Sequence, residues 1–470
     1  MYDELHRPQF HFTPRAHWMN DPNGLVCYKG EYHLFFQHSP GFVYHAPNSW
    51  GHAVSTDLVH WEQLEDAIAP DEYGFVWSGS GLVDWNDTAG LKRGSEDTLV
   101  AVYTTGGFGD PVSPCVQAIA FSNDRGRTFA RYEGNPVLGH VRARNRDPKV
   151  VWHEPTRRWI MALYLDGIDF ALYGSGDLKQ WEFLSELQVE GTGECPDLFE
   201  LPVDGDPGNR RWVFWGAAGV YLVGRFDGTR FVPETPPLVC EAGPNGYAAQ
   251  TFSDVPPEDG RTIQMSWMRG GRYPGMPFNQ QQSFPVELTL RTTAAGIRLF
   301  REPVREIELL YERKLEWRDL DLKPGMNRRA VFVRYGPPWR ERMADAHDNL
   351  IPETRGDLFD IRATVAPGEA AGFGVRIHGE ELHCDAAGTI RFLDREVAAP
   401  TGPEGRLDLR LLVDRTSLEL FANGGEVSAS FCYLPGSRDC ALEFYAEGGT
   451  VRFDELTVWE LKPAWKETQP

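Results

Sequence analysis

A short aspartate motif recurs four times in the first half of the chain, and this repeat constrains the fold more than any other feature. In each copy an Asp follows a small or polar residue by two positions and precedes an aromatic residue by four or five. The copies are Ser55-Thr-Asp57 to Trp61, Ser122-Asn-Asp124 to Phe129, Ser175-Gly-Asp177 to Trp181, and Arg225-Phe-Asp227 to Phe231. Their Asp residues lie 67, 53 and 50 positions apart. Because a four-stranded propeller blade takes about 50 residues, the repeat predicts a β-propeller.

Strand-like apolar runs give the number of blades. Four of them precede the aspartate motifs, and a fifth has no clear motif after it; they cover residues 33–37, 99–103, 159–164, 211–215 and 263–267. We therefore expect five blades. The alternative is an irregular β-sandwich in which the four turns match by coincidence.

Each expected blade begins with a polar segment before its first short strand. In a propeller the first strand of each blade lines the central channel, so these segments converge at one mouth. Asp21, Asp147 and Glu194 would then meet there. The alternative for Asp21 is a turn carboxylate at the start of the strand Leu25–Tyr28, because Pro22 and Gly24 beside it favour a tight turn.

The chain of 470 residues is too long for one ordinary core, and its pattern changes beyond Phe300. Pro303 followed by apolar residues at helical spacing predicts a short helix. Alternating Leu407, Leu409 and Leu411, and a hairpin turn at Asn423-Gly424, predict a β-sandwich. We expect an all-β chain, with a five-bladed β-propeller over residues 1–303, a short helical linker over 304–314 and a β-sandwich over 315–470.

Charge and composition exclude several classes of partner. The net charge is −21 and the pI is near 5.1, so the chain would repel nucleic acid and anionic membranes. The seven cysteines are scattered and form no C-x-x-C pair, which suggests neither zinc nor a disulfide framework. The N-terminus has no signal-peptide pattern and no run reaches transmembrane length, so we expect a cytoplasmic protein, or a secreted one if a leader has been removed.

Three carboxylates at one mouth are costly, because like charges raise one another's pKa. Glycoside hydrolysis uses such a set of carboxylates. One attacks as nucleophile, a second donates a proton to the leaving oxygen, and a third binds sugar hydroxyls. Any single one of the three could instead be a satisfied turn carboxylate.

Five motifs in order resemble the signature set of glycoside hydrolase family 32, the β-fructofuranosidases, which include invertases, inulinases, levanases and related fructosyltransferases. They are Trp18-Met-Asn-Asp-Pro-Asn-Gly24, Trp77-Ser-Gly-Ser80, Arg146-Asp-Pro148, Glu194-Cys-Pro-Asp197 and Tyr247-Ala-Ala-Gln-Thr-Phe252. The resemblance extends over roughly His6 to Leu290 and more weakly over the rest, where Val413–Phe421 looks like the family's sandwich hairpin.

The resemblance implies a role for each motif. Asp21 would be the nucleophile, Glu194 the acid/base, and Asp147 with Arg146 would hold the fructose hydroxyls. We expect Asp21 and Asp147 to raise the pKa of Glu194 and keep it protonated. No step needs a metal, nucleotide or other cofactor.

Further positions match those that line the fructose pocket in the family. They are Asn20, Gln37, Trp50, Trp77 and Ser78, with Trp267 a less certain member. Trp50 and Trp267 could equally pack between blades, and Gln37 could satisfy a strand edge.

The resemblance implies a retaining exo-β-fructosidase acting on levan, inulin, fructo-oligosaccharides or sucrose. A fructosyltransferase would share every catalytic residue, and a catalytically inactive sugar-binding propeller is the alternative from another class. Val286 stands where the family often has Arg, which leaves the subfamily open. The stretch 335–351 is longer than usual and reads as a solvated loop, unless Trp339 packs on the propeller or on a second subunit. Linkage preference, exo or endo action and oligomeric state stay open.

Overall fold

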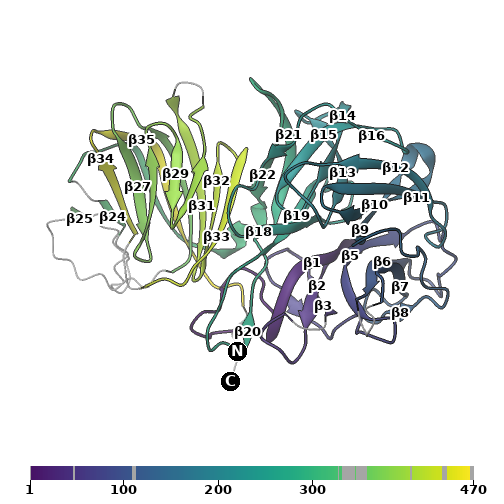
Figure 1. Cartoon of the computed structure of the whole chain (residues 1–470). Coiled ribbons are helices and arrows are strands. Elements are labelled where there is room, and N and C mark those ends of the chain that lie inside the picture. Colours follow the sequence, from purple (N-terminus) through teal and green to yellow (C-terminus); the bar gives the residue numbers. More distant parts are fainter. Residues whose placement is uncertain are drawn as a thin grey trace. The chain divides into compact units, whose positions relative to one another are not determined.

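The computed structural model describes residues 2–45, 48–107, 113–325, 328–330, 344–345, 357–402, 405–436 and 442–465, almost all of them β-structure or the turns between strands (Figure 1). The 335–351 stretch and Trp339 lie outside the described residues, apart from Ala344 and Asp345. The chain forms two compact units. One contains Phe12–Glu241 and Gly246–Val304, and the other contains Met1–His11, Ala242–Asn245 and Arg305–Pro470.

The first unit is the five-bladed propeller that the repeat predicts. Blade one is β1 (His17–Tyr28), β2 (Glu31–Ser39), β3 (Ser49–Ser55) and β4 (Glu62–Gln63). Blade two is β5 (Phe75–Asp84), β6 (Thr98–Gly106), β7 (Val116–Ser122) and β8 (Ala130–Arg131). Blade three is β9 (Arg146–His153), β10 (Arg158–Asp166), β11 (Asp169–Ser175) and β12 (Glu182–Gln188), with a 3-10 turn at Glu154–Thr156. Every neighbouring pair within these blades is antiparallel.

The last two blades complete the ring. Blade four is β13 (Asp197–Val203), β14 (Asp206–Trp215), β15 (Val220–Phe226) and β16 (Phe231–Pro233). Blade five is β18 (Gly246–Thr251), β19 (Thr262–Met268), β21 (Val286–Thr293) and β22 (Gly296–Pro303). Two short strands add to them: β17 (Leu238–Val239) pairs with β15, and β20 (Phe278–Asn279) pairs in parallel with β1. The first strands β1, β5, β9, β13 and β18 contact one another in this cyclic order, so they surround the channel.

The aspartate motif is a turn that the Asp side chain closes. Asp57 Oδ1 accepts backbone N–H bonds from Val59 (3.0 Å) and His60 (2.8 Å), and Asp177 and Asp227 do the same in their blades. In all four copies the residue after the Asp has a positive φ: Leu58 (64°), Arg125 (60°), Leu178 (61°) and Gly228 (90°). The repeat in the sequence is therefore a repeated backbone conformation.

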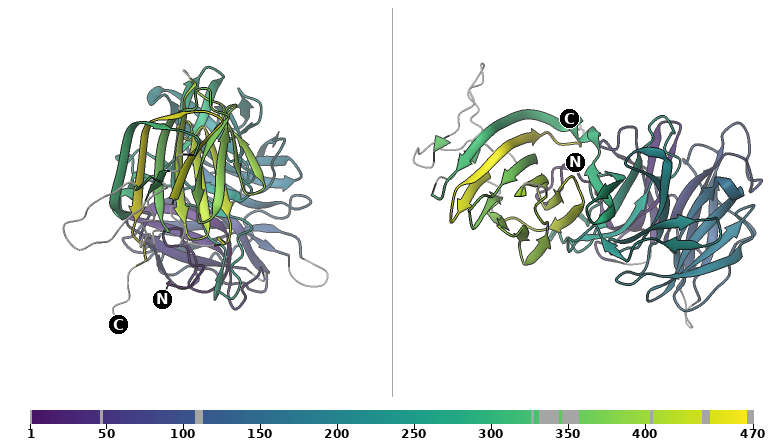
Figure 2. Two further views of the ribbon diagram at one scale, coloured as in Figure 1. Left: turned by 90° about the vertical axis from the view of Figure 1, so that its left-hand side faces the viewer. Right: turned by 90° about the horizontal axis from the view of Figure 1, so that it is seen from above.

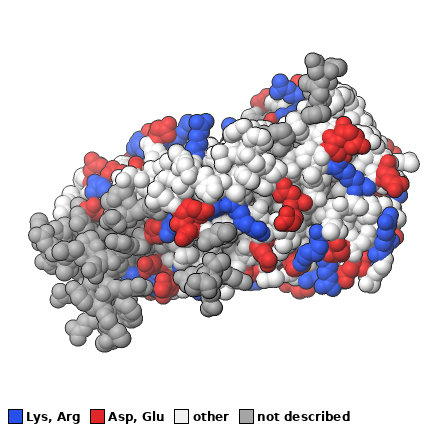
Figure 3. All heavy atoms as spheres, turned by 90° about the horizontal axis from the view of Figure 1, so that it is seen from below, with Lys and Arg blue, Asp and Glu red and all other residues white. Residues whose placement is uncertain are grey.

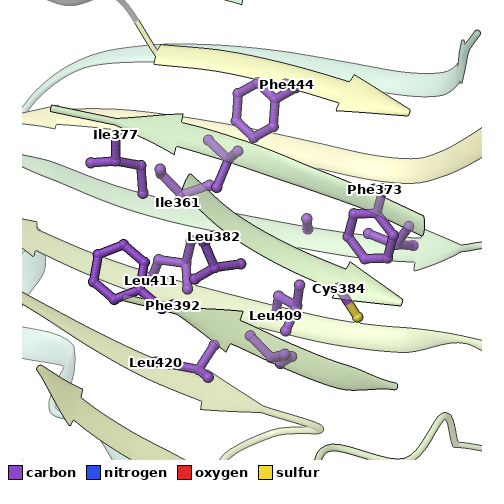
Figure 4. Close-up of a cluster of buried hydrophobic side chains, with 14 of the residues drawn as sticks. Ile361, Phe373, Ile377, Leu382, Cys384, Phe392, Leu409, Leu411, Leu420 and Phe444 are labelled. Carbon is purple, nitrogen blue, oxygen red and sulfur yellow. The ribbon is translucent and has the colours of Figure 1, made fainter. Parts of the chain in front are cut away.

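The second unit is a β-sandwich of two antiparallel sheets (Figures 1 and 2). One sheet is β23 (Tyr311–Leu322), β35 (Val451–Leu461), β26 (Phe359–Ala366), β31 (Leu407–Asp414), β32 (Ser417–Ala422) and β33 (Val427–Cys432). The other is β25 (Ala344–Asp345), β24 (Arg328–Ala330), β34 (Leu442–Glu447), β27 (Gly372–Ile377), β28 (Glu380–Asp385), β29 (Thr389–Phe392) and β30 (Arg395–Ala398). Alternate side chains of both sheets form one apolar core, which includes Ile361, Phe373 and Leu411 (Figure 4).

The expected helical linker is a 3-10 helix, η2 (Arg305–Leu310), and β23 begins directly after it at Tyr311. Residues 1–11, which we expected in the propeller, belong to the sandwich unit. The carboxylate of Asp414 accepts backbone N–H bonds from Gln9 (2.8 Å) and Phe10 (3.0 Å). His11 lies between Asp414 (2.8 Å) and Glu419 (2.7 Å), and all three side chains are buried. These partners are about 400 residues apart in sequence, which local pattern cannot reveal.

Charges of both signs mix on the face of the molecule that Figure 3 shows. On the face shown in Figure 3, the Lys and Arg side chains of the described residues lie among Asp and Glu side chains and form no continuous basic patch. Among the described residues, no helix has the length and apolar character needed to span a bilayer.

We expect His11→Phe to destabilise the sandwich unit by about 3–5 kcal/mol, because Asp414 and Glu419 would be buried without their cation. Burial alone would lower the pKa of His11, but the two carboxylates raise it to about 9. The stabilisation is therefore complete below about pH 6.5 and is lost as the pH rises through about 9. Denaturant unfolding from pH 6 to 10 measures both effects.

His383→Gln is the matched control, since His383 pairs with the exposed Glu447 at 3.3 Å in the same unit. It should change the unfolding free energy by less than about 1 kcal/mol. Equal losses in the two variants would contradict the assignment of stability to the buried cluster.

Candidate active site

Four of the five first strands carry a β-bulge, in which two residues oppose one residue of the second strand. Asn20 and Asp21 oppose Gln37, Trp77 and Ser78 oppose Thr104, Asp147 and Pro148 oppose Leu163, and Ala248 and Ala249 oppose Ser266. A bulge bends a strand and re-aims its side chains. The turn reading of the Asn20–Gly24 segment is therefore wrong: β1 continues through the whole motif, and the bulge presents Asp21.

Gly24 is needed just after this bulge. Its φ is 56°, and a Cβ there would lie 2.7 Å from the ring of Phe35 and 2.9 Å from the ring of Trp50. A larger residue would be strained in backbone and in packing, so Gly24 lets β1 lie against the blade-one core.

Glu194 reaches the site from the segment just before β13. Its φ is 58°, and that of Cys195 is 37°. Left-handed conformations are costly for residues other than glycine and persist where surrounding contacts fix them. The Cys195 N–H fixes this one by donating to Asp147 Oδ2 at 3.2 Å.

The structure brings the three predicted carboxylates together around Cys195 and Arg146. Cys195 Sγ lies 3.7 Å from Asp21 Oδ2 and 3.5 Å from Asp147 Oδ2. Arg146 pairs with Glu194 and lies 3.6 Å from Asp147 Oδ2. Ser78 Oγ donates to Asp21 Oδ2 at 2.5 Å. The Arg146 guanidinium thus contacts two of the three acids, Asp147 and Glu194.

Burial raises the pKa of Asp147 to about 7, and the charges of Asp21 and Glu194 add to this rise. Burial also raises the pKa of Asp21, although hydrogen bonds from Ser78 and Asn20 favour its ionised form. Glu194 behaves differently. Burial would raise its pKa, but the hydrogen bond from Tyr247 and the charge of Arg146 outweigh burial and lower it.

Our expectation of a raised pKa for Glu194 is therefore wrong for the site without substrate. The two aspartates are the groups whose pKa values rise, because they are the more deeply buried acids. The sequence showed the three like charges, but it did not show which acid the Arg146 guanidinium and the Tyr247 hydroxyl would contact.

The other predicted pocket residues occupy two kinds of position. Asn20 is 7% exposed, and its Oδ1 accepts from Trp18 Nε1 at 3.0 Å. Trp267 lies against Trp18, with ring centroids 6.4 Å apart, and its Nε1 donates to Gln280. Trp50 is fully buried, and its indole N–H donates to the Trp77 carbonyl at 2.9 Å. Of the two readings of Trp50, the structure favours packing between blades.

Gln37 is 1% exposed and lies opposite the bulge that holds Asp21. Neither its Nε2 nor its Oε1 has a hydrogen-bond partner among the described residues. Leaving a buried amide unpaired costs free energy, so this side chain does not act as a satisfied strand residue.

Sequence reasoning assigned no role to several residues of the site. Tyr247 lies within a quoted motif, and its hydroxyl donates to Glu194 Oε2. The Arg269 guanidinium lies 4.2 Å from the centre of the Tyr247 ring, and no motif signals it. His45 lies between two of the tryptophans, with its ring centroid 6.4 Å from that of Trp18 and 6.3 Å from that of Trp77. Among the described residues, no group of three or more His, Cys, Asp or Glu side chains has the geometry of a metal site.

The cluster of carboxylates is the kind of site that glycoside hydrolysis uses, and the family models assign the chain to the glycoside hydrolases. The chain belongs to glycosyl hydrolases family 32: the model of the family's N-terminal domain matches residues 11–303, and that of its C-terminal domain matches residues 339–460.

Relatives of known activity match along almost the whole chain. A levanase of Bacillus subtilis is 39% identical over 99% of this chain and 72% of its own length. A levanase of Bacillus sp. strain L7 is 32% identical over 100% of this chain and 53% of its own length. The crystal structure of an exo-inulinase from Aspergillus awamori superposes with a TM-score of 0.85 at 25% identity, covering 99% of this chain and 100% of that one.

We expect Tyr247→Phe to raise the pKa of Glu194, because the ionised carboxylate loses a hydrogen-bond donor. A ¹³C NMR titration of the Glu194 carboxyl, assigned by its absence in Glu194→Gln, measures the change. Tyr164→Phe is the control, since the Tyr164 ring lies 4.6 Å from the Arg146 guanidinium and should leave this pKa near the wild-type value. An unchanged pKa in Tyr247→Phe would show that this hydroxyl does not set the protonation of Glu194.

Proposed function

We propose that this chain is a retaining β-fructofuranosidase that removes terminal fructosyl units from fructans, fructo-oligosaccharides or sucrose. The single observation that carries the proposal is the cluster of Asp21, Asp147 and Glu194 around Cys195 and Arg146. The names of the matched relatives, levanase and exo-inulinase, support fructans as the substrate class.

Asp21 is suited to attack the anomeric carbon. The bulge fixes its backbone, and the 2.5 Å bond from Ser78 holds one carboxylate oxygen. This bond and the hydrogen bond from Asn20 favour the ionised form, which a nucleophile needs. The carboxylate can then attack and form the covalent fructosyl-enzyme.

Glu194 is suited to proton transfer in both steps. In the substrate-free site, Tyr247 and Arg146 favour its carboxylate form. When Arg146 donates hydrogen bonds to hydroxyls of the substrate, it interacts less strongly with Glu194. The pKa of Glu194 then rises, as a proton donor requires. After the leaving group departs, the carboxylate form accepts a proton from the attacking water.

Asp147 and Gln37 are suited to hold the sugar. Asp147 has a pKa of about 7, so near neutral pH it both accepts and donates hydrogen bonds to hydroxyls. Gln37 offers a buried amide without a partner among the described residues, opposite Asp21. Hydroxyls of a terminal fructose would satisfy it.

Hydrolysis of a panel of levan, inulin, levanbiose and sucrose tests the proposal and identifies the preferred linkage. Free fructose as the main product, released first as the β-anomer by NMR, supports a retaining hydrolase. Longer or cyclised products would identify a transferase, and no product would identify a sugar-binding propeller.

We expect Glu194→Gln to lower kcat by about 10²–10⁴-fold with KM changed only a few-fold, because the amide keeps the shape but cannot donate the proton. Steady-state kinetics on levan and sucrose give both constants. Glu186→Gln is the control, because Glu186 is 46% exposed and pairs with Arg142 on the surface of blade three. Wild-type turnover in Glu194→Gln would assign the acid to another residue.

A further inference from the structure

Every bulge at the channel mouth is held by a group from the preceding blade. Trp50 of blade one donates to the Trp77 carbonyl of blade two at 2.9 Å. The Asp147 N–H of blade three donates to Thr104 Oγ1 of blade two at 3.0 Å. In blade five, the Ala248 N–H donates to the Ala217 carbonyl of blade four at 2.9 Å. A bulge takes backbone groups out of the strand ladder, and these contacts replace the lost partners.

The bulge of blade one is held from blade five by Gln282. Its Nε2 donates to the Asn20 carbonyl at 2.6 Å. The Gln282 side chain is completely buried, and its own backbone N–H donates to the Phe12 carbonyl at 2.9 Å. Gln282 also forms an antiparallel bridge with Trp267 of β19. Both ends of this residue are therefore fixed.

The bonded atom belongs to the peptide unit that carries the proposed nucleophile. The Asn20 carbonyl and the Asp21 N–H lie in one rigid plane. A hydrogen bond to this carbonyl therefore restricts rotation of the peptide and, with it, the direction in which Asp21 leaves the backbone. The 2.5 Å bond from Ser78 then fixes the far end of the same side chain.

The same amide carries a cost in stability. Gln282 Oε1 is buried and has no hydrogen-bond partner among the described residues. An apolar side chain of similar size would avoid this cost. The bond from Nε2 to the Asn20 carbonyl is therefore what distinguishes a glutamine from an apolar residue at this position.

We propose that Gln282 is a positioning residue that orients Asp21 for attack through the Asn20 carbonyl. This inference rests on the proposed role of Asp21 and adds a residue that lies outside the five family motifs. It also makes blade five, which supplies none of the three carboxylates, responsible for the geometry of the nucleophile.

Crystal structures and kinetics of Gln282→Leu test the inference. Gln281→Leu is the matched control, because the neighbouring Gln281 is also fully buried but its amide bonds Tyr273 and Met268. In Gln282→Leu we expect the Asp21 carboxylate to move by more than about 0.5 Å relative to Asp147, and kcat to fall about 10- to 100-fold with KM changed less than about threefold. An Asp21 position and a kcat equal to those of Gln281→Leu would overturn the inference.

The comparison of the Asp21 position in the two crystal structures does not depend on the proposed function. If the wild-type protein released no fructose from any fructoside, the proposed function would fail, while the position of Asp21 would still decide the role of Gln282.

Gln282→Glu gives a second test that a purely structural role would not affect. A glutamate can donate to the Asn20 carbonyl only when protonated, so the ratio of its kcat/KM to that of the wild type should rise as the pH falls. A ratio that stays constant with pH would overturn the inference.

Discussion

The site depends on the β-bulges of the first strands. In four blades, two residues of the first strand oppose one residue of the second strand at the same place. An unbulged strand would point alternate side chains to its two faces, and adjacent residues such as Asn20 and Asp21 could not both serve the channel mouth. The bulges remove this restriction but leave backbone groups without ladder partners. Side chains and loops of the preceding blade supply those partners, so the site takes its precision from the closed ring of blades.

The charges of the site follow from this geometry. Asp21 and Asp147 are held on bulged strands, where burial raises both pKa values. Glu194 comes from the segment just before β13 and contacts Arg146 and Tyr247, which lower its pKa. Three acids of nearly equal intrinsic strength thus acquire different tasks because their surroundings differ in burial and in hydrogen-bond donors.

Sequence reasoning predicted the blades well because each carries its own local signal. Asp57 and its counterparts close a turn whose hydrogen bonds span only three or four residues. The three carboxylates could be predicted to converge because propeller symmetry relates them. The bulges could not be predicted, because the register of a first strand depends on how it pairs with the second strand. Trp50 could not be assigned either, since its ring could face the pocket or the next blade. Gln282 has no local signal, because its partner lies 262 residues away.

The pairing of His11 with Asp414 has a consequence for how the chain folds during synthesis. The ribosome makes residues 1–11 before the propeller blades, but their carboxylate partner follows about 400 residues later. All five blades are complete by Pro303, long before Asp414 emerges. The propeller can therefore close before this segment meets its partner, and the sandwich unit completes its hydrogen bonding only when Gln9, Phe10 and His11 reach Asp414.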